Sequence, residues 1–119
     1  MTAKTESNDD LIDFRAHAIA FWAESRSGTA ERANAHTEIA DAIVQQWTEA
    51  GNAREILTPM LQDNLIEIRF AAASYLLKGG DTGAAIPVLE DLAQTKTSVG
   101  MVASSARFLL MKHRSEHSS

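Results

Sequence analysis

Apolar residues along the chain recur at spacings of three and four, the period of an amphipathic α-helix, and no stretch alternates as a half-buried strand does. The first apolar stripe consists of Leu11, Phe14, Ala18, Phe21 and Trp22. A second stripe, over residues 29 to 50, consists of Ala33, Ala40, Ile43, Val44 and Trp47. Further helices are expected over 53 to 63, 65 to 78, 82 to 94 and 98 to 112. The pattern predicts an all-α fold of about six helices in three pairs.

Residue types that end or cap helices set the expected boundaries. The first helix should start near Asn8, and Gly51 should end the second helix, since glycine tolerates left-handed dihedrals. Asn52 and Asn64 are each followed three residues later by a glutamate, a variant of the capping box. We therefore expect a disordered tail over residues 1 to 8, a single helical domain over 9 to 113, and a polar tail over 114 to 119.

The segment from Leu65 to Lys78 is apolar on most sides of its helical wheel. The strip that could meet water consists only of Glu67, Ala71, Ser74 and Lys78. A helix that is apolar nearly all round must be covered by neighbours. This segment is predicted to be the central helix of a stack.

An internal repeat accompanies this pattern. The motif "TPML" at 58 to 61 corresponds to "IPVL" at 86 to 89, and "RFAAASYLL" at 69 to 77 corresponds to "VASSARFLL" at 102 to 110. The offsets are typical of helical repeats, and the proline in each first helix should kink it.

Over residues 52 to 112 the chain resembles the HEAT-like repeats of α-solenoids, in which the second helix begins with an apolar residue and an arginine, here Ile68 and Arg69. Over about 10 to 112, "ANAHTEIADAIVQQWTEAG" followed by "LTPMLQDNLIEIRFAAASYLL" is similar to the bacterial family known as domain of unknown function 2019. The resemblance implies a compact bundle of HEAT-like helix pairs and no established activity.

Composition narrows the classes of partner. The chain has no cysteine, which fits a reducing cytoplasm, and it has no apolar run of the length that spans a membrane. Residues 1 to 50 hold four Lys/Arg against nine Asp/Glu, and the remainder holds seven against seven. This acidic balance argues against nucleic acid and favours a basic protein surface as partner.

One face of the helix at 29 to 50 is the candidate docking surface. We name as the acidic strip the four residues Glu31, Glu38, Asp41 and Gln45. A solvated helix face is the simpler interpretation of such a charge run. If the helix lies on the outside of the stack, the same side chains would form a protein-binding surface.

Arg69 and His36 are the residues most compatible with a ligand pocket. Arg69 lies in the apolar sector of its helix and needs a partner, for which Asp63 is the candidate; the functional alternative is that Arg69 binds an anionic group. His36 lies within the apolar stripe with Ala40 and Ile43, so a core histidine with one hydrogen bond is favoured over a ligand or a base.

No metal or catalytic site is expected. His113 and His117 have a ligand spacing, but they fall in the polar tail without a third ligand. The chain shows no thiol nucleophile and no serine in a nucleophile elbow, and "GGDTG" at 79 to 83 follows no strand. These observations predict a non-enzymatic protein that uses no cofactor.

The function predicted from the sequence is therefore a protein-protein interaction module, such as an adaptor or an immunity-type inhibitor. One alternative is a homo-oligomer held by an apolar face that so short a stack leaves uncovered. The other is a small-molecule-binding or enzymatic protein with a pocket near Arg69 and His36.

Overall fold

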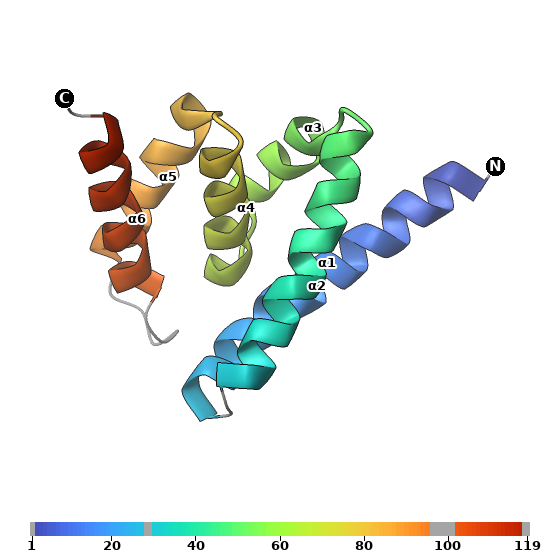
Figure 1. Cartoon of the computed structure of the whole chain (residues 1–119), viewed down its shortest axis with the longest axis horizontal. Helices are drawn as coiled ribbons and strands as arrows, with labels where there is room; N and C mark the ends of the chain where they lie inside the picture. The colour runs from blue at the N-terminus through green and yellow to red at the C-terminus, as the bar shows by residue number, and fades with distance from the viewer. Residues whose placement is uncertain (1, 28–29, 96–101, 118–119) are drawn as a thin grey trace. The chain divides into compact units, whose positions relative to one another are not determined.

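The computed structural model describes the backbone of residues 2–27, 30–95 and 102–117. These residues form six α-helices and one short 3-10 helix, and they contain no strand (Figure 1). The predicted all-α fold is confirmed. The chain divides into two compact units, residues 1–53 and 54–119, where the sequence predicted a single domain over 9–113.

The first unit is a pair of helices, α1 (Thr2–Ser27) and α2 (Ala30–Glu49), that pack against each other. The predicted stripe of α2 is buried throughout. Of the stripe predicted for α1, Phe14, Ala18 and Trp22 are buried. The rings of Phe14 and Trp47 join the two helices, with centroids 5.4 Å apart.

Helix α1 begins at Thr2 rather than near Asn8, so the expected N-terminal tail is helical. The prediction placed the acidic Asp9 and Asp10 in the first turn of a helix that starts near Asn8. That part of the chain has no glycine or proline to end a helix, so nothing in the backbone opposes its extension. As a result, Asp9 and Asp10 lie inside the helix and not in its first turn.

The second unit contains α3 (Ala53–Leu57), the 3-10 helix η1 (Thr58–Gln62), α4 (Ile66–Lys78), α5 (Thr82–Gln94) and α6 (Val102–His117). Helix α5 packs against both α4 and α6, and η1 packs against α4 and α5. The chain after residue 111 continues as helix to His117, so most of the expected C-terminal tail is also helical.

Pro59 ends an α-helix rather than kinking one. The sequence predicted a single bent helix over 53 to 63, but α3 stops at Leu57 and Pro59 lies in the first turn of η1. Proline has no N–H to donate and suits a first turn, where that donor would be unsatisfied. In the second copy, Pro87 does lie inside α5, as predicted.

Helix α4 starts from an extended residue, Leu65, and not from the asparagine that was predicted to cap it. Asp63 supplies the local hydrogen bond instead, since its Oδ1 accepts from the N–H of Leu65 at 2.9 Å. The predicted cap at Asn64 is therefore wrong, and the carboxylate one residue earlier orients the turn.

The core of the second unit supports the predicted central position of α4. Ile68, Ala72 and Ala73 are fully buried, and Leu76 is 3% exposed. Helix α4 contacts η1, α5 and α6. Its remaining apolar flank is only half-buried, and Leu65 at its start is exposed. The helix is thus enclosed by its own unit along one broad side.

Two glycines at the turn between α4 and α5 differ in backbone conformation, since only one of them has a positive φ angle. Gly80 has a φ of +92°, and the turn closes through the N–H of Asp81, which donates to the Leu76 carbonyl at 2.9 Å. Gly83 lies in the first turn of α5, with no atom within 4 Å of an added Cβ.

These two positions predict opposite effects of the same substitution. Gly80→Ala should lower the free energy of unfolding by about 1–2 kcal/mol, because an L-residue is strained at that φ. Gly83→Ala should raise it by about 0.4–1 kcal/mol, because alanine restricts the unfolded chain. Urea denaturation of both variants checks the pair. A loss of stability in Gly83→Ala, or none in Gly80→Ala, would contradict the assigned turn.

Candidate protein-binding surface

The acidic strip lies on the outer face of α2. Glu31, Glu38, Asp41 and Gln45 are all exposed. Their spacings of seven, three and four residues place them on one side of the helix. The opposite side holds the buried stripe that packs in the first unit. Periodicity alone was sufficient to locate this surface.

The strip has an apolar border. Ile39 is 44% exposed, and the small residues Ala35 and Ala42, one turn to either side of it, are also exposed. At the far end, the Gln45 amide donates to the Glu49 carboxylate at 3.0 Å. This arrangement sets carboxylates beside a small exposed apolar surface, which combines charge with a contact able to exclude water.

The charge of the chain is divided between the two units. Residues 1–53 contain four Lys/Arg and nine Asp/Glu, and residues 54–119 contain seven of each. The first unit therefore accounts for the whole net charge of −5, because the second is balanced. The unit that bears the strip therefore has the more negative charge of the two.

His36 does not stand alone in its helix pair. Its Nδ1 lies 2.7 Å from Nδ1 of His17 on α1, and both side chains are half-buried. His36 thus makes a hydrogen bond to a side chain of the neighbouring helix. Its partner was missed because periodicity shows which residues share a face of one helix, not which residues meet across two helices.

Arg69 is half-buried on α4, and its Nε is buried without a hydrogen-bond partner. Asp63, the partner expected for Arg69, accepts a hydrogen bond from the Leu65 N–H at 2.9 Å. The ion pair between Arg69 and Asp63 stays a prediction. Arg69 and His36 lie in different units of the chain.

An unsatisfied buried donor opposes folding, which gives Arg69 a testable energetic signature. Arg69→Met keeps an unbranched side chain and removes that donor, so the free energy of unfolding should stay level or rise by about 1–3 kcal/mol. Arg54→Met is the control, since Arg54 is exposed and its ion pair with the half-buried Asp81 is worth about 1 kcal/mol or less. A clear loss of stability in Arg69→Met, measured by urea denaturation, would show that the guanidinium stabilises the fold.

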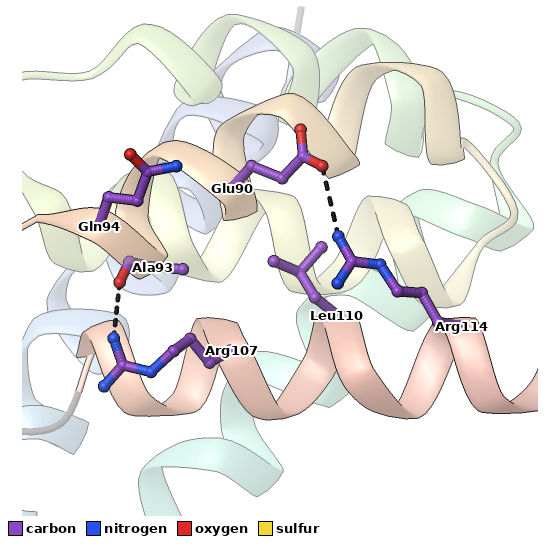
Figure 2. Close-up of a pocket in the computed structure, with 6 residues that line it drawn as sticks. All are labelled: Glu90, Ala93, Gln94, Arg107, Leu110 and Arg114. Atoms are coloured by element: carbon purple, nitrogen blue, oxygen red, sulfur yellow. Dashed lines mark hydrogen bonds and ion pairs between the residues drawn. The ribbon is translucent and has the colours of Figure 1, made fainter.

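Figure 2 shows a pocket between α5 and α6 in the second unit, lined by Glu90, Ala93, Gln94, Arg107, Leu110 and Arg114. Both arginines are engaged within the chain. Arg107 Nη1 donates to the Ala93 carbonyl at 2.7 Å, and Arg114 Nη2 lies 3.5 Å from Glu90 Oε2 (Figure 2). A cation bound to the last carbonyls of a helix stabilises its C-terminus. These contacts give the arginines a structural role in joining α6 to α5.

A second pocket of this unit lies beside the turn between α4 and α5. Its lining consists of Leu77, Lys78, Gly80, Thr82, Leu109, Lys112, His113 and Glu116. Neither pocket includes Arg69. Among the residues that the structure describes, no three or more His, Cys, Asp or Glu gather as ligands of a metal ion.

Comparison with known proteins gives no match: no family model fits the chain, and neither the curated proteins nor the solved structures include a significantly similar one. The resemblance to HEAT-like repeats and to domain of unknown function 2019 therefore stays a prediction. Within the described ranges, no helix has the length and hydropathy needed to cross a bilayer.

Proposed function

We propose that this chain is a non-enzymatic protein-interaction module that binds a basic partner through the acidic strip of α2. The observation behind this proposal is the exposure of all four strip residues on one helix face, next to the exposed Ile39. Complementary charge would steer the partner and set its orientation, and the apolar border would supply area removed from water.

Two biological forms of this activity suit the charge distribution. An adaptor would use the first unit to hold a basic protein. An immunity-type inhibitor would use the same carboxylates to cover the cationic surface of a toxin. Both forms place the chain in the cytoplasm, in keeping with the absence of cysteine from the sequence.

Affinity capture from native lysate, with two matched variants, tests the strip. In Glu38→Lys/Asp41→Lys the strip is reversed; in Glu55→Lys/Glu116→Lys the same change of net charge is made at exposed acids of the second unit. We expect the strip variant to capture about one tenth or less of the partner that wild type captures. The control variant should capture as much as wild type.

The capture is repeated at low and high salt, because contacts between exposed charges are screened over about 10 Å at 0.1 M. Circular dichroism verifies that both variants are helical. Unchanged capture by the strip variant would place the binding surface elsewhere on the chain.

Homo-oligomerisation is the second candidate function, and exposed apolar side chains favour it. Phe108 is 57% and Met111 62% exposed, one turn apart on α6, and Ile12 on α1 is 64% exposed. Large exposed apolar residues that lie together mark contact surfaces. Sedimentation of Phe108→Ser/Met111→Ser beside wild type separates this candidate from the first, because the strip is intact in that variant.

A further inference from the structure

The contact between His17 and His36 joins the two helices of the first unit and has no part in the proposed function. The Nδ1 atoms lie 2.7 Å apart, and the ring centroids lie 5.0 Å apart. The remaining 2.3 Å corresponds to the distances of the two nitrogens from their own ring centres. Both Nδ1 atoms therefore lie on the line between the rings, which is the geometry of a straight N–H···N hydrogen bond.

The distance between the two Nδ1 atoms fits a shared proton and is too short for a metal ion bound between them. A metal ion bound by both nitrogens on that line would need them about 4 Å apart, since each Zn–N bond is about 2.0–2.1 Å. No third ligand joins the pair among the described residues. A proton fits the observed 2.7 Å.

The His17–His36 hydrogen bond depends on how many of the two rings are charged. A neutral imidazole has one donor and one acceptor nitrogen, so two neutral rings, or one neutral and one charged ring, form the bond. When both rings are charged, two N–H groups face each other with no acceptor between them. Like charges then stand at hydrogen-bond distance and repel.

We propose that the His17–His36 contact is an acid-sensitive latch that holds α1 against α2 and opens when both imidazoles become charged. The proposal rests on the geometry of the first unit alone. The ring contact of Phe14 with Trp47, which also joins the two helices, contains no group that takes up protons. Acidification would therefore destabilise the helix pair, and each helix would lose backbone protection because helices depend on tertiary packing for most of their stability.

Charged side chains lie on the same side of either helix as the two histidines. They lie within two turns of the rings in the sequence and are Asp10, Asp13 and Glu24 on α1 and Arg32 on α2. The carboxylates offset part of the repulsion between two charged rings. They supply no acceptor between the two N–H groups that then face each other.

The stability of the α1–α2 packing is expected to fall with falling pH. The hydrogen bond is available while at least one ring is neutral, and it is lost when both rings are charged. Acidification therefore removes a contact that only the folded pair makes. Imidazole changes charge between pH 8 and 5, which sets the range to examine.

Hydrogen exchange of the full chain at about pH 7.5 and about pH 5 tests the latch, with protection factors corrected for intrinsic exchange. In wild type, protection of α1 and α2 should fall about tenfold, the size of effect of one lost charge-assisted hydrogen bond, while α4 and α5 change little. His36→Leu should abolish the fall, and His113→Leu, a matched change in the second unit, should retain it.

An equal fall in His36→Leu, or no fall in wild type, would overturn the proposal. Imidazole nitrogen NMR of wild type provides a second measurement, needed if His36→Leu fails to fold. It should show one protonated and one unprotonated Nδ1 at the higher pH and two protonated Nδ1 atoms at the lower pH. Two unprotonated Nδ1 atoms at the higher pH would also overturn the proposal.

Discussion

Phe14→Ala is expected to lower the free energy of unfolding of the first unit by about 3–5 kcal/mol. Phe14 is 0% exposed and its ring lies against Trp47, so truncation removes a large buried surface and leaves a cavity in the helix pair. Both tryptophans of the chain, Trp22 and Trp47, belong to this unit, so tryptophan fluorescence follows its unfolding directly.

Ile12→Ala is the control for Phe14→Ala, because Ile12 lies on the same helix but is 64% exposed. We expect this substitution to change the unfolding free energy by about 0.5 kcal/mol or less. Similar losses in the two variants would mean that Phe14 does not lie in the core of the helix pair.

Ile68→Ala should destabilise the second unit by about 2–5 kcal/mol. Ile68 is 0% exposed on α4, and its neighbour on that side one turn later, Ala72, is too small to fill the space it leaves. Tyr75 is the single tyrosine of the chain and also lies on α4, so its fluorescence reports on this unit. A two-unit chain should show the loss in the tyrosine signal and a smaller change in the tryptophan signal.

The comparison for Ile68 is Leu65→Ala, at the exposed start of α4. Leu65 is 39% exposed, so its truncation should cost about 1 kcal/mol or less. If Leu65→Ala lowered the unfolding free energy as much as Ile68→Ala, Leu65 would be buried, contrary to its exposed fraction of 39%.

Periodicity and helix-ending residues predicted most of the helices. The apolar spacing of α2 predicted both its buried stripe and its exposed acidic strip, because the two faces of an amphipathic helix follow from its own sequence. Gly51, with a φ of +81°, ends α2 as expected. The outer ends of α1 and α6 were predicted too short, because polar segments without glycine or proline can also form helix.

The contacts that were missed depend on how separate segments meet. The partner of His36 follows from the pairing of α1 with α2, which no single helix encodes. One signal was present: His17 lies beside the apolar stripe of α1, next to Ala18, and so close to the face that packs. The hydrogen bond from the Leu65 N–H to Asp63 depends on the extended backbone before α4, which helix periodicity does not show.

Site-specific photo-crosslinking tests most directly whether the acidic strip of α2 is the surface that binds a partner. A photoreactive amino acid is placed at Gln45, within the strip, and in a second variant at Ser104, which is exposed on α6. We expect a salt-sensitive adduct with a basic protein from position 45 and none from position 104. An adduct from position 104 alone, or the same adduct from both positions, would contradict the assignment of the strip as the binding surface.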